Sequence, residues 1–244
     1  DTIALHHFDD QLPGVGIDQS AGGFNLQWHG AQHSPSSPFS VTLGDDTTCQ
    51  VDFCQPGGLT IPSSVNKSGT IAQPDDLDGS QSFTVEFFVK IPDNDSGVMI
   101  SRGNTAEASW LLHHNSTDGA STFIWSERHT DGALANVSTT VPATLDTWHH
   151  IAVTRHFDET ANQAYVRIYV DGVRNSDCGL IVGAKAIPAG EALHFAALPG
   201  GTAYFHGSLD ELRISDGSMY TSDFPVPALL HVEPTTLALF HLDS

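Results

Sequence analysis

WHHIAVTRHFDETANQAYVRIYVDG, residues Trp148–Gly172, is the stretch of the sequence that decides the fold. Ile151 and Val153 alternate with smaller or polar residues, a pattern typical of a half-buried β-strand. The polar, turn-rich residues 156–163 separate this strand from a second one, and Asp171-Gly172 after it indicates a tight turn at positions that accept positive φ. Two antiparallel strands and a following turn are therefore expected. The second strand places its apolar residues at Val166, Ile168 and Val170.

Short strands of the same kind recur along the chain. The clearest is Phe83–Ile91, FTVEFFVKI, whose apolar residues at alternate positions should form the middle of the core. Turn formers such as PGVG, SPSSP and PDDLDGS separate short strands before it, and no long amphipathic helix is indicated. The expected strands are Phe24–Trp28, Phe39–Leu43, Val51–Phe53, Leu59–Ile61, Val98–Arg102, Ser109–His114, Ser121–Arg128, Leu180–Val182, Leu193–Ala197 and Tyr204–Ser215.

Two motifs in these strands resemble a known family. W-H-H-I-A-V-T-R at 148–155 with I-Y-V-D-G-V at 168–173, and FHGSLDELRIS at 205–215, are similar to laminin-G-like, concanavalin A-like domains. The resemblance extends over most of the chain from Phe83 onward and only loosely over 11–78. It implies an all-β fold, a two-sheet antiparallel jelly-roll β-sandwich. We expect residues 1–244 to form one such domain, a length that is ordinary for an all-β domain.

The composition restricts the classes of partner. The chain has 9 Lys and Arg against 29 Asp and Glu, a formal net charge of −20. Phosphate recognition on nucleic acid and attraction to an anionic membrane are therefore disfavoured. No apolar run approaches the roughly 20 residues that span a bilayer. The three cysteines lack the CxxC spacing of a zinc site; Cys49 and Cys54 either form a local disulfide or are free thiols.

The two ends of the sequence resemble each other. TIALHHFDD at 2–10 and TLALFHLDS at 236–244 share Thr, Ala, Leu, His and Asp at matched positions. One interpretation is that they form two similar edge strands lying side by side in one sandwich. The other is that the second segment opens a further copy in a tandem array. Because one copy fills this chain, we prefer the first interpretation.

The segment DGSMYTSDFPVP, residues 216–227, resembles versions of this domain in phage virion and tail proteins. The resemblance implies a head decoration or tail component on the virion surface, or else a secreted extracellular module. Other virion proteins, further copies of the chain and a surface polysaccharide are the implied partners; decoration proteins are usually multimeric.

A structural calcium ion is also implied. Asp210 lies at the start of a predicted strand and alternates in register with Leu212 and Ile214, so its side chain should point toward the core. A buried carboxylate there needs charge compensation or several hydrogen bonds, and Ca²⁺ could supply the compensation. Related jelly rolls often tie this segment to the N-terminal strand through Ca²⁺, which implies Asp9 and Asp210 as side-chain ligands, with Asp18 or a carbonyl of Ala21, Gly22 or Gly23 as further candidates. The alternative is that Asp210 accepts backbone N–H bonds without a metal.

Enzyme motifs are lacking. Adjacent Asp210 and Glu211 should point to opposite faces of a strand, and neither the E-x-D-x-x-E strand of related glucanases nor a G-x-S-x-G or H-E-x-x-H motif is present. We therefore expect a non-enzymatic structural or adhesion module, with a secreted lectin-like module as the alternative and a glucanase-like hydrolase as an outside alternative. Candidate sugar-binding residues are Tyr165, Arg167 and Tyr169 on one strand. A second group on the preceding strands is Trp110, Trp125, His113 and Arg128, and a place in the core is the competing interpretation for the two tryptophans.

Overall fold

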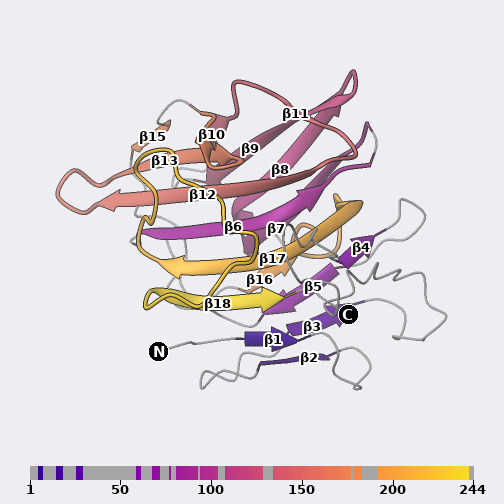
Figure 1. Ribbon diagram of the computed structural model, residues 1–244. Helices are drawn as coiled ribbons and strands as arrows, with labels where there is room; N and C mark the ends of the chain where they lie inside the picture. The colour runs from indigo at the N-terminus through magenta and orange to yellow at the C-terminus, as the bar shows by residue number, and fades with distance from the viewer. Residues whose placement is uncertain are drawn as a thin grey trace.

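Two β-sheets packed face to face form the molecule (Figure 1). The computed structural model describes residues 5–7, 15–18, 26–29, 59–61, 68–71, 77, 81–92, 94–103, 108–128, 134–176, 179–182 and 192–241. Within these ranges the regular structure consists of strands, and no helix there is long and apolar enough to span a bilayer. The predicted antiparallel jelly-roll sandwich is confirmed. The strands expected at Phe39–Leu43 and Val51–Phe53 lie outside the described residues.

Sheet A has β6 and β17 at its centre. In spatial order it contains β2 (Val15–Asp18), β1 (Leu5–His7), β18 (Thr236–His241), β17 (Gly207–Asp216), β6 (Phe83–Lys90), β12 (Trp148–Asp158), β13 (Gln163–Val170) and β15 (Gly179–Val182). Two short strands add to it, β4 (Leu59–Ile61) beside β17 and β14 (Val173–Arg174) beside β13.

Sheet B is antiparallel and lies behind sheet A; its strands β7, β8 and β9 form a meander. Its order is β3 (Leu26–His29), β5 (Ser68–Ile71), β16 (Leu193–Phe195), β7 (Ser96–Gly103), β8 (Ala108–Thr117) and β9 (Ala120–Arg128). β9 also pairs with β10 (Leu134–Ser138) and β11 (Ala143–Thr144). β2 pairs with β1 on one side and β3 on the other, so it joins the two sheets.

The core lies between the sheets, as the alternation in β6 predicts. Side chains at odd-numbered positions of this strand point inward, and those at even-numbered positions point outward. The inward set continues through Ile151 and Val153 of β12 and the apolar residues of β13. The core-facing side chains of β6 and the residue after it are Phe83, Val85, Phe87, Val89 and Ile91.

β12 and β13 form the predicted hairpin, with Ile151 opposite Val170. Both strands run further than the sequence indicates, because the polar residues up to Asp158 continue β12. The turn at Asp171-Gly172 is confirmed, with φ of 52° and 76°. Glycine is required at 172, because a Cβ there would lie 2.0 Å from the carbonyl oxygen of Phe224.

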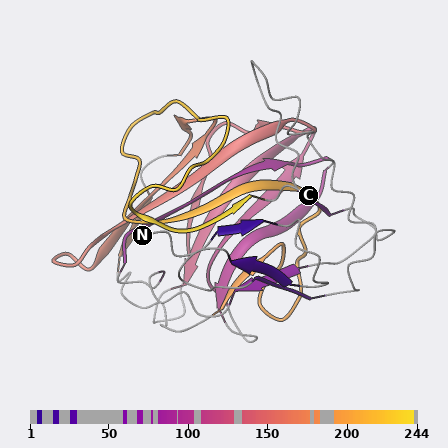
Figure 2. The same ribbon diagram turned by 60° about the horizontal axis from the view of Figure 1, so that its bottom comes forward.

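The two similar terminal segments lie side by side. β1 pairs with β18 in parallel, Leu5 opposite Leu239 and His7 opposite His241, which is the register of the sequence match (Figure 2). The side-by-side interpretation is therefore confirmed. Neither strand is at an edge, however, because β2 covers β1 and β17 flanks β18.

Candidate functional site

The segment between β17 and β18 crosses the outer face of sheet A (Figure 1). We call residues 217–235 the C-terminal strap. Its first turn is held by Thr84 of β6, whose hydroxyl donates to the carbonyl of Gly217 at 2.9 Å and accepts from the Met219 N–H at 3.0 Å. Further along, the Phe224 N–H donates to the carbonyl of Gly172 at 2.9 Å. The strap is thus fixed to β6 and to the β13–β14 turn.

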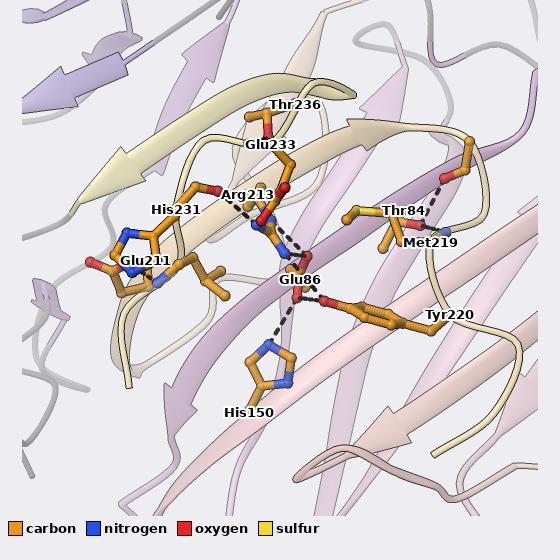
Figure 3. Close-up of polar contacts among 12 residues, drawn as sticks. Thr84, Glu86, His150, Glu211, Arg213, Met219, Tyr220, His231, Glu233 and Thr236 are labelled. Atoms are coloured by element: carbon orange, nitrogen blue, oxygen red, sulfur yellow. Dashed lines mark hydrogen bonds and ion pairs between the residues drawn. The ribbon is translucent and has the colours of Figure 1, made fainter. Parts of the chain in front are cut away.

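A buried polar group holds the strap at its centre (Figure 3). We call Glu86, His150, Arg213 and Tyr220 the Glu86 cluster. Glu86 Oε1 accepts from Arg213 Nε at 2.8 Å and lies 2.7 Å from Arg213 Nη2. Glu86 Oε2 accepts from the Tyr220 hydroxyl at 2.9 Å and from His150 Nε2 at 3.1 Å. Arg213 Nη1 also donates to the strap carbonyl of His231 at 2.7 Å.

The electrostatics of the Glu86 cluster favour one fixed charge state. Burial by itself would raise the pKa of Glu86, but the hydrogen bond from His150 and the Arg213 charge outweigh burial and lower this pKa. Burial and the neighbouring carboxylate raise the pKa of Tyr220, so its hydroxyl remains a donor. A carboxylate with four donors around it binds its neighbours firmly and has little capacity left to take up a proton. The cluster therefore fastens the strap rather than performing acid–base chemistry.

The strap also covers the predicted sugar-stacking stripe. Tyr169 is fully buried because Phe224 packs against its ring at 5.4 Å, and its hydroxyl donates to the carbonyl of Tyr220 at 3.2 Å. Its neighbours Tyr165 and Arg167 keep partial exposure. Tyr169 is therefore not available for stacking on a sugar. The sequence does not indicate that the strap crosses this face of the sheet, so the burial of Tyr169 was not predicted.

Trp110 and Trp125 lie in the core, and their assignment as sugar-stacking residues is wrong. Both side chains are fully buried, and their rings stack at 4.8 Å, with Phe83 of the opposite sheet packed 5.5 Å from Trp110. Trp110 Nε1 donates to the carbonyl of Leu77 at 3.1 Å. Both rings point inward because alternate residues of a strand share one face, and Leu112 and Phe123 occupy the same inward faces of the two strands.

A β-bulge changes the predicted orientation of Asp210. The register of β17 against β6 shifts between Asp210 and Arg213, and Glu211 has φ of 52°. Leu209 and Leu212 therefore both face the core, while Asp210 pairs with Phe88, whose ring packs in the separate cluster under the strap. The predicted core-facing side chain of Asp210 is wrong.

The contacts of this bulge involve backbone N–H groups. Asp210 Oδ1 accepts from the Glu211 N–H at 2.8 Å, and Glu211 Oε2 accepts from the Leu230 N–H of the strap at 2.8 Å. The first contact is of the kind expected without a metal. Within the described ranges no three His, Cys, Asp or Glu side chains gather closely enough to hold a metal ion. Asp9 and Gly23 lie outside the described residues, so calcium stays a prediction.

Sheet B presents the more open outer face. Since Trp110, Leu112, Phe123 and Trp125 point inward, the alternate residues of β8 and β9 point outward. We call these outward side chains the β8–β9 face; His113 and Ile124 are paired across its centre. It combines apolar side chains with a few hydrogen-bonding groups, the mixture found in small-molecule sites. Its partly exposed residues are Leu111, His113, Thr122, Ile124 and Arg128.

A partly buried ion pair at the start of β12 gives a pH-dependent prediction. His149 Nδ1 lies 2.7 Å from Asp171 Oδ2, and its Nε2 lies 3.1 Å from the Thr144 carbonyl. The hydrogen bond to Asp171 raises the pKa of His149 against the opposing effect of burial. A raised folded-state pKa stabilises the protein below the unfolded value, about 6.5, and the stabilisation is lost as pH rises through the folded pKa.

We therefore expect His149→Gln to lower the free energy of unfolding more at about pH 6 than at about pH 9. Asp171 stays ionised over this range because its own pKa is lowered. Urea unfolding at several pH values measures the difference, with the exposed His156→Gln on the same strand as control. An equal loss for His149→Gln at both pH values would contradict the assignment.

Comparisons with known proteins agree with this architecture. A family model for the concanavalin A-like lectin/glucanases superfamily matches residues 64–223, well over half of the chain. No curated protein matches the sequence significantly.

Solved structures show the same fold at low sequence identity. The binding domain of botulinum neurotoxin serotype C1 has a TM-score of 0.58 and 11% identity, covering 89% of this chain and 48% of its own. The binding domain of botulinum neurotoxin DC in complex with SialylT has a TM-score of 0.53 and 12% identity, covering 84% and 46%. Tailspike protein 2 of an Escherichia coli O157:H7 bacteriophage has a TM-score of 0.50 and 14% identity, covering 76% and 26%. This chain thus spans about half of each neurotoxin domain and about a quarter of the tailspike.

Proposed function

Because the chain belongs to the concanavalin A-like lectin/glucanases superfamily, we propose that it is a non-enzymatic adhesion module that recognises carbohydrate. One observation carries the non-enzymatic part. The four buried carboxylates of the described residues each have a fixed hydrogen-bond donor. Glycoside hydrolysis needs two carboxyl groups that face one open bond about 5–10 Å apart. The buried carboxylates are Glu86, Glu127, Asp210 and Glu211.

The ligand surface in this proposal is the β8–β9 face. The strap covers the outer face of sheet A, whereas Leu111, His113 and Ile124 keep partial exposure on sheet B. Thr122 offers a hydroxyl group for hydrogen bonding, and Arg128 a guanidinium whose Nε donates to the Ala108 carbonyl at 3.5 Å. Desolvation lowers the pKa of His113, so its ring is neutral at pH 7 and suited to contact a sugar.

Binding to a broad glycan panel tests the proposal. We expect saturable binding to a subset of glycans, weakened at least tenfold by Arg128→Ala and unchanged by Arg174→Ala. The second variant removes the same charge from an exposed position on the other sheet. Equal affinities for both variants would exclude the β8–β9 face, and a panel without binding by folded protein would exclude carbohydrate recognition.

The biological setting that we propose is the surface of a phage virion, as a decoration or tail component, or otherwise the extracellular medium. The support is the resemblance of residues 216–227 to virion versions of this domain. Most of that segment belongs to the strap and holds it to sheet A, with Tyr220 in the Glu86 cluster and Phe224 packed against Tyr169. Partners would be capsid or tail proteins, or further copies of the chain. Antibody raised against the protein should label intact virions, and unlabelled particles would exclude this setting.

We further propose that calcium stabilises the domain through Asp210. Chelation with EDTA should lower the melting temperature, and Asp210→Asn should abolish the difference between EDTA and calcium. Melting curves in both conditions provide the measurement. Identical curves for the unsubstituted protein would favour the hydrogen-bonded, metal-free arrangement of Asp210.

A further inference from the structure

The loop after β16 returns to β7 before β17 begins. We call residues 196–206 the β16–β17 loop. At its start the Ala196 N–H donates to the Met99 carbonyl at 2.8 Å, and near its end the Ala203 carbonyl accepts from the Val98 N–H at 3.0 Å. The last part of this loop therefore lies beside β7, next to the place where the pairing of β16 with β7 ends.

Tyr204 of this loop points to the outer side of sheet B. It pairs with Val98 in a parallel bridge, and Val98 pairs with His113 of the β8–β9 face. Paired residues on adjacent strands project from the same face, and the next residue, Phe205, lies in the core. We call the four side chains that follow one another across the outer face the Tyr204 row: Tyr204, Val98, His113 and Ile124.

Close packing holds the tyrosine ring in one position. Val98 is only 3% exposed although it lies outside the core cluster, as expected of a short side chain with a ring on either side. Gly201 has φ of 73°, and a Cβ there would lie 2.7 Å from the Tyr204 hydroxyl oxygen. Any larger residue at 201 would displace the hydroxyl. The ring is thus fixed and partly exposed, which lowers the entropy cost of stacking a ligand on it.

The surroundings of the Tyr204 row carry no negative charge. The chain has 29 Asp and Glu, yet none of them occupies an outward position of β8 or β9. Desolvation lowers the pKa of His113, so the row is uncharged at pH 7. Beside the row, Thr122 offers a hydroxyl and Asn115 an amide, whose Oδ1 accepts from the Ser96 hydroxyl at 3.0 Å. Exposed rings flanked by neutral hydrogen-bonding groups suit a neutral sugar.

We propose that a neutral polysaccharide binds along the Tyr204 row with one pyranose ring stacked on Tyr204, an inference that rests on the proposed recognition of carbohydrate by the β8–β9 face. The row spans three strand spacings, about 14 Å, so an extended chain of sugars covers it rather than a single ring. The sugars beyond Tyr204 lie within reach of Asn115 and Thr122 and continue towards Arg128. One arginine does not offset the formal charge of −20, which repels acidic polysaccharides.

Affinity electrophoresis of the full chain tests the proposal, in gels that contain a neutral polysaccharide (dextran, galactomannan or xylan) or an acidic one (alginate or hyaluronan). We expect retardation in at least one neutral gel and in neither acidic gel. Tyr204→Ala should weaken binding about tenfold or more, whereas Tyr204→Phe keeps the ring and should bind within about twofold of the unsubstituted protein. Tyr165→Ala is the matched control, because it removes a partly exposed tyrosine from the other sheet and should leave binding unchanged.

The outcomes separate this inference from the proposed function. If glycans bind but Tyr204→Ala binds as tightly as the unsubstituted protein, with urea unfolding unchanged, the stacking assignment is wrong and recognition by the β8–β9 face stands. Retardation by acidic polysaccharides alone would likewise overturn only the neutral class. If the folded protein binds no glycan, both proposals are wrong. Gly201→Ala keeps the tyrosine but displaces its hydroxyl, so it should also weaken binding, and unchanged binding would contradict the position of the ring.

Discussion

Replacing Glu127 with alanine is expected to lower the free energy of unfolding by about 3–5 kcal/mol, because it leaves a buried arginine charge unpaired. Arg155 of sheet A and Glu127 of sheet B are both fully buried, joined by Nη2–Oε1 at 2.6 Å and Nε–Oε2 at 3.0 Å. Trp125 Nε1 also donates to this carboxylate, at 3.3 Å. The pair connects the two sheets through the middle of the core. Urea unfolding followed by tryptophan fluorescence measures the loss.

Two comparisons separate the buried pair from general charge effects. Lys90→Ala breaks the exposed contact with Asp146, 3.6 Å long, and should cost about 1 kcal/mol or less. Replacing Glu127 and Arg155 together by methionine should cost less than the sum of the single substitutions, because no charge is left unpaired. A loss of under about 1 kcal/mol for Glu127→Ala would show that the pair does not stabilise the sandwich.

Replacing Glu86 with alanine is expected to release the C-terminal strap and to cost about 3–5 kcal/mol. The substitution removes the shared acceptor of Arg213, His150 and Tyr220, all in or beside the strap. Chymotrypsin should then cleave rapidly after Tyr220, whose ring stacks on Phe224 at 3.5 Å in the folded protein. Limited proteolysis followed by mass spectrometry identifies the cut.

Tyr220→Phe is the matched control for that experiment. It removes one hydrogen bond to Glu86 and keeps the stacked ring, so we expect a loss of about 1 kcal/mol and a strap that still resists cleavage. Equal protease resistance of the Glu86→Ala protein and the unsubstituted protein would show that the aromatic contacts alone hold the strap.

The strands of the core could be predicted from sequence because their signal is local. Alternation in β6 and in the β12–β13 hairpin depends only on residue order, and the turn at Asp171-Gly172 depends on two residues that accept positive φ. The match between the terminal segments likewise predicted that β1 and β18 lie together. This alternation can be recognised in the sequence whatever the arrangement of the other strands.

The site could not be predicted as well, because it depends on which distant segments meet. Nothing local to Tyr169 shows that Phe224 will cover it, and nothing local to Asp210 shows the bulge that turns it away from the core. Glu86 sits in an apolar strand, and its ion-pair partner is not Lys90 of the same strand but Arg213, which is 127 residues away. The one indication of the Glu86 cluster in the sequence was this single acidic residue at an outward-facing position of an otherwise apolar strand.

The parallel pairing of Leu5 with Leu239 has a consequence for biosynthesis. Pairs of this sequence separation close late, since loop closure over long distances is slow. On the ribosome β1 has no partner in β18 until residue 241 has left the exit tunnel, although β12 and β13 can already form their local hairpin. The seam between the two terminal strands therefore completes sheet A last, and until then β1 has β2 as a partner on one side only.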